Sequence, residues 1–402
     1  MYQTELHYQI LSVFIFILGA CIGSFINVCI WRIPRSESIV FPPSHCPECD
    51  YLIPGYHNIP IISWIVLRGK CANCGQKISS RYIAVEILTG LLITTTWYNL
   101  YINSLSPYLI IPLLILISAF IICSAIDIEH LIVPDCVTDF TCACGVISSI
   151  IFPQLHSIST TSNNFIEGQN KFILPMVNNL QEAIFHHNYI SNIRIQSLLS
   201  SILGISFGYL IITGIIEIGK RTIGIKKNHS KHAEGTTFTI TEKQICVGEE
   251  KDYFEDIFMR KKDTIILFDG TIILNDISRE FKKLQIKDEG KTIFIDGEQL
   301  KSNIDSLSGS TKHWNIPREV MGFGDAKFMG MLGAFLGPEV CFIVIMLASI
   351  LGAIAGIGFI SLRLKKWYSE IPFVPYLAIS AYLWINFSKQ LSLFYQKIIF
   401  AL

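Results

Sequence analysis

Two aspartates stand where apolar stretches of this chain meet polar sequence. Asp325 lies within residues 321–327, between a charged block and a long apolar run, and Asp127 ends another apolar run. A carboxylate at a membrane boundary costs free energy, so an acid retained there is a candidate functional residue. Two such acids on separate runs predict a paired-carboxylate site.

Paired carboxylates can carry out general acid–base chemistry. Two carboxylates held close do not both ionise readily, so one keeps a proton and the pair titrates as a unit. The ionised member takes a proton from water as the water attacks a peptide carbonyl, and the protonated member donates to the carbonyl oxygen. Because the apolar runs contain no Ser/His pairing and the chain has no His-Glu-x-x-His motif, the pattern favours aspartyl proteolysis.

Glycines surround the second aspartate. Gly322 and Gly324 permit close backbone approach, so an extended substrate could lie against Asp325. Further glycines continue a small-residue face suited to helix packing: Gly330, Gly333 and Gly337. The alternative is a glycine turn at the start of a helix, with Asp325 as its N-terminal cap.

Five other acids lie in or near the apolar runs: Glu86, Glu129, Asp135, Asp139 and Glu217. An interhelical hydrogen bond or interfacial exposure explains Glu217. The same explanation is open for Glu86, which lies deeper and near Arg81. The three acids close to Asp127 fit solvated loop or cap positions, and the residues alone do not choose between Asp127 and Asp135.

Four of the twelve cysteines form two Cys-x-x-Cys pairs, and 21 residues separate the pairs: Cys46, Cys49, Cys71 and Cys74. Four thiolates at this spacing predict one tetrahedral zinc ion, and since no coordination position stays open the ion would be structural. Two disulfides or a redox dithiol are the alternatives, and a cytoplasmic location disfavours the disulfides.

The composition predicts a polytopic membrane protein. Of the 402 residues 51% are hydrophobic and only 16% are charged. The net charge is zero, which gives no support to a nucleic-acid partner. Residues 220–320 hold 18 Lys or Arg and 17 Asp or Glu, so 35 of the chain's 64 charged residues lie in one block, which we interpret as soluble.

The apolar runs predict eight transmembrane helices, the first of which we interpret as a retained span rather than a signal peptide. Their approximate limits are 9–30, 83–102, 107–126, 136–153, 197–218, 324–337, 340–361 and 373–400. Basic residues follow the first, fifth and seventh runs, so the positive-inside rule places these three connections in the cytoplasm. Alternation then places Asp127 and Asp325 at the same cytoplasmic surface and residues 154–196 outside.

The charged block carries a strand pattern. Apolar and polar residues alternate in residues 236–241, 264–268 and 291–296, and we expect turns at three dipeptides: Asp269-Gly270, Glu289-Gly290 and Asp296-Gly297. We therefore expect a small β-rich cytoplasmic domain over residues 222–316.

Several ordered motifs together resemble the type IV prepilin peptidases, which are leader peptidases and N-methyltransferases of the Gly-x-Gly-Asp aspartyl protease group. The segments that carry the resemblance are residues 23–28, 32–36, the tetracysteine segment with Pro60, Trp64 and Gly69, residues 80–82 with Glu86, residues 127–135, and residues 318–327. The resemblance implies that Asp127 and Asp325 are the catalytic pair, since the first family aspartate precedes the Pro134-Asp135 pair by seven residues.

The resemblance also implies a bacterial inner-membrane enzyme that cuts prepilins or pseudopilins after a leader glycine, at the cytoplasmic face of the lipid bilayer. Methylation of the new N-terminus with S-adenosylmethionine is implied as well, and is associated with the tetracysteine loop. No residue is assigned to the methyl donor. The alternatives are a peptidase without methyltransferase activity and a zinc-stabilised membrane transporter or scaffold.

Two features depart from the family pattern. Val374 replaces a glycine in the closing motif, and if that glycine admits substrate or a helix, Val374 narrows the site. The block before Asp325 is an insertion, which either docks a partner or is inert. The expected organisation is a first helix (1–31), a tetracysteine loop (32–82), helices two to five (83–221), the inserted domain (222–316) and helices six to eight (317–402).

Overall fold

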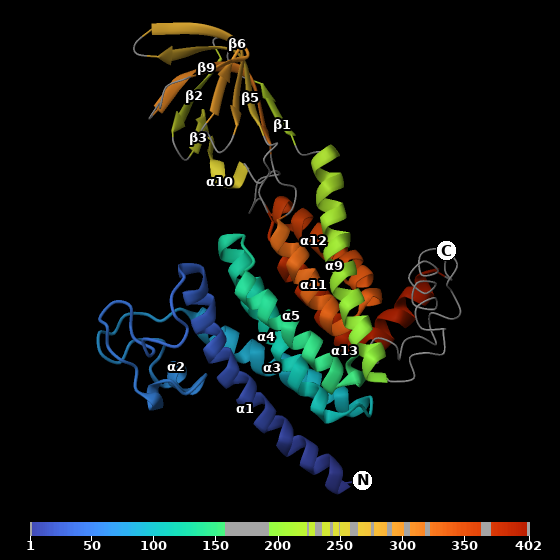
Figure 1. Cartoon of the computed structure of the whole chain (residues 1–402). Helices are drawn as coiled ribbons and strands as arrows, with labels where there is room; N and C mark the ends of the chain where they lie inside the picture. The colour runs from blue at the N-terminus through green and yellow to red at the C-terminus, as the bar shows by residue number, and fades with distance from the viewer. Residues whose placement is uncertain are drawn as a thin grey trace. The chain divides into compact units, whose positions relative to one another are not determined.

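The computed structural model describes residues 2–156, 193–222, 225–229, 235–241, 244–248, 250–257, 264–274, 277–287, 292–300, 306–317, 322–362 and 371–399. The chain forms two compact units (Figure 1). One comprises Met1–Ile212 with Phe323–Leu402, and the other comprises Thr213–Gly322. The predicted outside loop at 154–196 lies mostly outside the described residues.

A helix covers each of the eight predicted apolar segments. These helices are α1 (Tyr2–Arg32), α3 (Ser80–Ile102), α4 (Ile110–His130), α5 (Asp135–Ile151), α9 (Ile193–Thr222), α11 (Phe323–Leu336), α12 (Pro338–Ser361) and α13 (Val374–Ile399). A mostly helical fold with a β-sheet region is therefore confirmed.

Five helices of the described residues are long and apolar enough to cross a membrane, in the segments Tyr8–Arg35, Ser80–Ile102, Pro107–His130, Ile193–Gly219 and Pro338–Phe359. At about 1.5 Å per residue, the 14 residues of α11 extend only about 21 Å, less than the roughly 30 Å hydrocarbon core. The count of eight spans and the cytoplasmic placement of the loops remain predictions.

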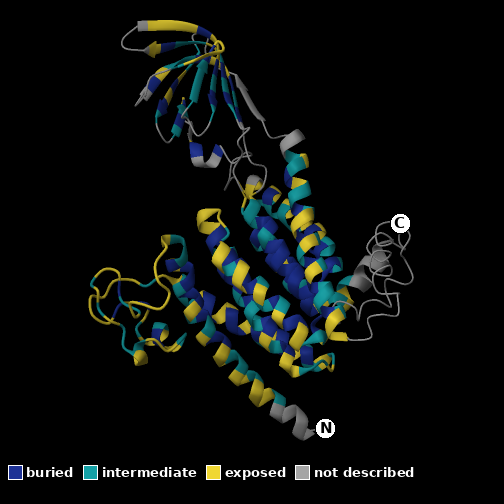
Figure 2. Cartoon of the chain, viewed as in Figure 1, coloured by how far each residue is buried: buried dark blue, intermediate teal, exposed yellow. Residues whose placement is uncertain are grey.

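Small residues let the membrane helices approach closely. Gly19 of α1 lies against α3, where an added Cβ would come within 2.9 Å of Gly90 Cα. Gly204 of α9 and Gly333 of α11 face each other more tightly, because a Cβ on Gly333 would lie 2.0 Å from the Gly204 carbonyl oxygen. Figure 2 shows α11 as buried along most of its length. The predicted small-residue packing is thus observed at Gly333.

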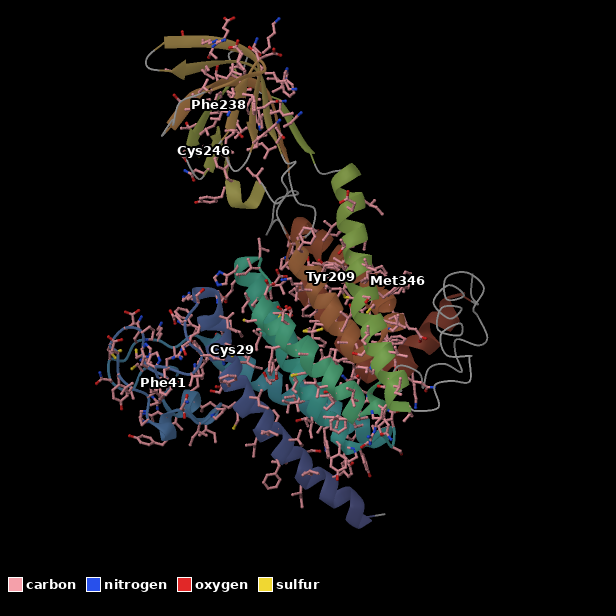
Figure 3. All side chains as sticks on the ribbon, viewed as in Figure 1. Cys29, Phe41, Tyr209, Phe238, Cys246 and Met346 are labelled. Carbon is pink, nitrogen blue, oxygen red and sulfur yellow. The ribbon has the colours of Figure 1, made fainter. Side chains whose placement is uncertain are left out.

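The second unit contains an antiparallel sheet with the order β4-β3-β2-β9-β5-β6-β7-β8, and β1 also pairs with β9. The strands are β1 (Ile225–His229), β2 (Thr236–Thr241), β3 (Gln244–Val247), β4 (Glu250–Tyr253), β5 (Ile265–Leu274), β6 (Ile277–Lys287), β7 (Thr292–Ile295), β8 (Glu298–Gln299) and β9 (Ser306–Pro317). A short helix, α10 (Phe254–Ile257), follows β4. Alternating strand residues form an apolar cluster that includes Phe238, labelled in Figure 3.

One predicted turn is wrong. Asp269 and Gly270 lie inside β5, where Asp269 has a φ of 47° and an added Cβ on Gly270 would come within 1.9 Å of the Ser310 carbonyl oxygen. Asp tolerates a positive φ and Gly has no side chain, so the two residues interrupt the regular pairing of a long strand here and do not reverse the chain direction. The turn at Asp296 and Gly297 joins β7 to β8, while residues 289–290 lie outside the described residues.

Candidate active site and metal centre

The tetracysteine loop (residues 32–82) brings its four cysteine sulfurs together. The Sγ atoms of Cys46, Cys49, Cys71 and Cys74 all lie within 4.8 Å of one another. The Cys46–Cys74 and Cys49–Cys71 sulfur distances are 3.9 and 4.0 Å, close to the roughly 3.8 Å between sulfurs that each lie about 2.3 Å from a tetrahedral zinc ion. The sulfurs are free rather than disulfide-bonded, so the predicted cluster is confirmed and its donor set fits zinc.

Backbone groups prepare two of these thiols for metal binding. The N–H groups of Cys74 and Asn73 donate to the Cys71 sulfur and lower its pKa from 9.0 to about 7. The backbone of Tyr51 and then the side chain of Asn73 lower the pKa of Cys49 in the same way. Because the thiolate is the form that binds a metal ion, these hydrogen bonds favour Cys49 and Cys71 as ligands. The neighbouring sulfurs raise the pKa of Cys46 and Cys74, so in the metal-free cluster the negative charge lies on Cys49 and Cys71.

Glu86 fastens the tetracysteine loop to α3. Its Oε2 atom accepts a hydrogen bond of 2.7 Å from the backbone N–H of Ile61, and its side chain is buried. Arg81 pairs instead with Glu129. Glu86 also forms a side-chain hydrogen bond with Ser24 of α1. The interhelical hydrogen bond considered from the sequence is therefore confirmed, and the contact with the loop backbone is an additional one.

A second pair of contacts holds the loop from the side of α1. Asn27 donates to the Tyr82 carbonyl oxygen at 3.0 Å. Buried Arg32 donates to the carbonyl oxygens of Ser38 and Pro42 at 2.9 and 2.7 Å. The start of the loop is thus tied to the end of α1, its middle is tied to α3 through Ile61, and its end enters the first turn of α3, which is tied to α1.

Asp127 lies in the last turn of α4 and is only 5% exposed. The backbone N–H of Val374 donates a hydrogen bond of 3.1 Å to its Oδ2 atom. Val374 is the first residue of α13, so its N–H is one of those that have no partner within the helix. The carboxylate of α4 therefore caps the start of α13 across 247 residues of sequence.

The acids near Asp127 have different surroundings. Glu129 pairs with Arg81, and Asp135 forms a 2.7 Å ion pair with Lys327 of α11. Asp135 and Asp139 are both exposed. Among the four acids between residues 127 and 139, Asp127 is the buried one.

Asp325 lies in the first turn of α11 and is 8% exposed. The connection between α4 and α5 packs against this turn, because a Cβ on Gly324 would come within 2.7 Å of Val133. The rings of Phe120 on α4 and Phe328 on α11 lie 5.9 Å apart. Figure 1 shows the end of α4 and the starts of α5 and α11 at the same end of the bundle, so both aspartates belong to the region where these helices meet.

Sequence reasoning missed the backbone N–H of Val374 as a member of this region. A signal was present, since Pro372 and Pro375 flank Val374 and proline is common at the start of a helix. The side chain of Val374 is fully buried.

The sequence also offered Asp325 as the N-terminal cap of a helix. In the structure Asp325 is the third residue of α11, so it lies within the first turn of the helix and not at the cap position that precedes it.

Two segments match known families. Residues 17–100 match the Bacterial Peptidase A24 N-terminal domain, and residues 310–357 match the Type IV leader peptidase family. The four clustered cysteines lie in the first matched segment and Asp325 lies in the second. Asp127 lies between the two.

Similarity to individual proteins supports the same family. A Prepilin leader peptidase/N-methyltransferase of Myxococcus xanthus is 44% identical over 123 residues, which are 31% of this chain and 36% of the relative. A Type 4 prepilin-like proteins leader peptide-processing enzyme of Escherichia coli is 35% identical over 156 residues, 33% of this chain and 54% of the relative.

The chain thus aligns with only part of those two relatives. A Prepilin leader peptidase/N-methyltransferase of Aeromonas hydrophila is 23% identical over 406 residues, which cover 95% of this chain and 92% of the relative. No solved structure matches the chain.

Proposed function

We propose that this chain, which belongs to the type IV leader peptidase family, cleaves prepilins or pseudopilins after their leader glycine. The observation that carries this proposal is the burial of Asp127 and Asp325 at one end of the helix bundle, with the α4–α5 connection packed beside Asp325. The burial of Asp127, set against the exposure of Asp135 and Asp139, supports Asp127 as the first member of the pair.

The proposed mechanism needs one ionised and one protonated carboxyl group. The ionised carboxylate accepts a proton from water, whose oxygen then bonds to the scissile carbonyl carbon, while the protonated carboxyl donates to the carbonyl oxygen. The tetrahedral intermediate collapses as the C–N bond breaks: the leaving nitrogen takes the proton that the first carboxylate received from water, and the second carboxylate takes a proton back from a hydroxyl of the intermediate. The N–H of Val374 fixes the orientation of Asp127 for this chemistry.

The proposed location is the cytoplasmic face of a bacterial inner membrane. The basic residues after the first, fifth and seventh apolar runs support this orientation. An eight-helix arrangement, in which the short α11 is enclosed by its neighbours, would place both aspartates at that face. The substrates would be pilin-like proteins with a basic leader, a glycine and an apolar helix.

The four clustered cysteines would hold one structural zinc ion. A closed set of four thiolates leaves no open position for substrate, so the ion would order the loop rather than take part in cleavage. Metal analysis of the purified protein should find about one zinc ion per chain. The zinc should be lost when Cys46 and Cys71 are both replaced by Ser.

N-methylation of the cleaved substrate is the second proposed activity. The similar proteins of Myxococcus xanthus and Aeromonas hydrophila are both named Prepilin leader peptidase/N-methyltransferase, which supports this activity. S-adenosylmethionine would be the methyl donor. Mass spectrometry of the mature substrate should show one added methyl group at its N-terminus, and an unmodified N-terminus in the presence of the donor would reduce the proposal to a peptidase alone.

Expression of the chain with a prepilin in a peptidase-deficient host tests the cleavage itself. The expected product is a pilin shortened to the residue after the leader glycine. A pilin of full length, together with proton-coupled flux in vesicles containing the protein, would instead favour a zinc-stabilised transporter.

A further inference from the structure

A short helix of the tetracysteine loop has an apolar outer face. In α2 (Ile62–Val66), the side chains of Ile62, Ile65 and Val66 are 58%, 59% and 71% exposed. Their i, i+3, i+4 spacing places them on one side of the helix. Ser63 faces inward, because its Oγ accepts from the Ile59 N–H at 2.9 Å and donates to the Tyr56 carbonyl oxygen. The exposed side is therefore a defined face.

This face is held next to a membrane helix. Ile61 immediately precedes α2, and Glu86, which accepts its N–H, lies six residues after the start of α3. At about 1.5 Å per residue this is about 9 Å along α3 from its first residue. The helix α2 therefore begins beside the second turn of a membrane-capable helix, not beyond its end.

The conformation of Ile61 shows that the attachment is specific. Ile61 has a φ of 64° and a ψ of −53°, which a β-branched residue rarely adopts. This backbone conformation directs the Ile61 N–H to the buried carboxylate of Glu86. A hydrogen bond of 2.6 Å from the Ile62 N–H to the Pro60 carbonyl oxygen closes a tight turn at Ile61, so a local turn of the loop presents the Ile61 N–H to Glu86.

The surroundings of the face match a lipid surface. Next to Glu86, the exposed side of α3 continues with three large apolar residues, Ile87, Leu88 and Leu91. Arg68 and Lys70, which follow α2, are exposed cations suited to anionic headgroups. The loop exposes other large apolar side chains too, including Phe41, labelled in Figure 3.

We infer that α2 is an interfacial helix whose Ile62, Ile65 and Val66 side chains enter the boundary between lipid headgroups and acyl chains. The Glu86–Ile61 hydrogen bond fixes its depth, and Arg68 and Lys70 contact the headgroups. The tetracysteine loop is then attached to the bilayer surface as well as to the helices. This inference does not depend on the peptidase activity.

Photocrosslinking of the full-length protein tests the inference. A benzoylphenylalanine replaces Val66 in one variant and the exposed Gln76 of the same loop in a matched control. Both proteins are irradiated in vesicles of phosphatidylethanolamine and phosphatidylglycerol, and adducts are identified by mass spectrometry. Lipid adducts should form several-fold more often at position 66 than at position 76.

Glu86 variants test the attachment in the same assay. Glu86→Ala should lower the lipid adducts at position 66 toward the level of position 76, whereas Glu86→Gln, which keeps an acceptor oxygen, should retain most of them. Equal adduct yields at the two positions, or adducts at position 66 with an added pilin instead of lipid, would overturn the inference. Unchanged lipid adducts in a folded Glu86→Ala protein would overturn the role of Glu86.

Discussion

At the scale of single residues, the hydrogen bond from Val374 to Asp127 joins a side chain of α4 to the backbone of α13. A helix N-terminus attracts negative charge because its first N–H groups point outward. The bond therefore restricts one carboxylate oxygen of Asp127 and fixes the direction of the other. This makes Val374 a positioning residue whose contribution comes from its backbone and not from its side chain.

Replacement of Val374 by proline removes the N–H and keeps a backbone that suits the first position of a helix. We expect Val374→Pro to lower kcat for pilin cleavage by roughly ten- to a hundredfold with little change in KM, since a hydrogen bond to a charged group contributes about 1.5–3 kcal/mol. Val374→Ala keeps the N–H and should stay within a few-fold of the unmodified protein. Equal kcat values for the two variants would exclude the positioning role.

Cys71 provides a pH-dependent prediction outside the membrane helices. Its pKa is lowered from 9.0 to about 7, so in the metal-free protein its thiolate stabilises the loop fully above pH 9. This contribution is lost as the pH falls through 7. After chelation, alkylation of Cys71 followed by mass spectrometry should therefore show half-maximal rate near pH 7. A midpoint near pH 9 would contradict the hydrogen bonds that the N–H groups of Cys74 and Asn73 donate to the Cys71 sulfur.

Residue types identified the candidate acids and the cysteine cluster from local pattern alone. The spacing of Cys46, Cys49, Cys71 and Cys74 is a local property that predicts the clustering of their four sulfurs, and this clustering is confirmed. The partners of Glu86 and Asp127 have no local signal, because 25 and 247 residues separate them from Ile61 and Val374. Only the packing of the helices creates these pairs.

At the scale of secondary-structure elements, close helix crossings depend on glycine. Gly204 of α9 and Gly333 of α11 meet backbone to backbone, and no rotamer change can relieve a clash with a carbonyl oxygen. Long apolar runs predicted both helices, since they report on burial and length. They do not report which faces touch, so the pairing of these two glycines was not predictable.

Gly333→Ala should therefore destabilise the helix bundle by about 1–3 kcal/mol, as overpacking does. Gly358→Ala is the matched control, because an added Cβ on Gly358 of α12 meets nothing within 4 Å. Alanine at that position should be neutral or stabilising by up to about 1 kcal/mol. Unfolding of both purified variants in detergent, monitored by circular dichroism, separates the two effects, and equal stability would show that α9 and α11 do not cross at this point.

The β strands show the same limit of local pattern. Alternation of apolar and polar residues predicted β2 because strand side chains alternate between two faces. The Asp269-Gly270 dipeptide, which is a common turn signal, lies inside β5. Gly270 pairs with Phe281 of β6 and Thr311 of β9, while Asp269 is left out of both registers. Strand pairing around the dipeptide therefore overrides its local preference for a turn.

At the scale of the whole molecule, the inserted unit has its own apolar core. Phe238 and Phe281 stack edge to face within it, with ring centroids 6.3 Å apart and an interplanar angle of 79°. The residues of this core all come from the unit itself. A segment with a separate core is expected to fold by itself.

Residues 225–317 expressed alone should therefore unfold cooperatively in denaturant. Phe281→Ala should remove about 3–5 kcal/mol of that stability, the usual cost of removing a buried phenylalanine. Tyr253→Ala is the matched control, since Tyr253 is an aromatic residue with more than half of its surface exposed. A gradual transition, or equal losses for both variants, would show that the segment depends on the membrane unit.

The membrane unit brings two acids from distant parts of the chain to one end of a helix bundle. Asp127 lies in the last turn of α4 and Asp325 in the first turn of α11. The α4–α5 connection contacts α11 through Val133, and α5 contacts it through the Asp135–Lys327 ion pair. Apolar runs and basic clusters predict through topology that the two acids share one membrane face, and their pairing stays a prediction. The burial of Asp127 emerged only from the packed helices. The proposed chemistry requires both acids, because neither carboxyl group can act as base and acid in the same step.

Cleavage of a purified prepilin by purified variants in lipid vesicles tests this requirement most directly. Asp127→Asn and Asp325→Asn should each abolish cleavage, with a loss of at least about a hundredfold, the lower range for general acid–base catalysis. Asp139→Asn, at an exposed acid of α5, should cleave like the unmodified protein. If either Asp127→Asn or Asp325→Asn still cleaves at the rate of Asp139→Asn, the paired-aspartate site is contradicted.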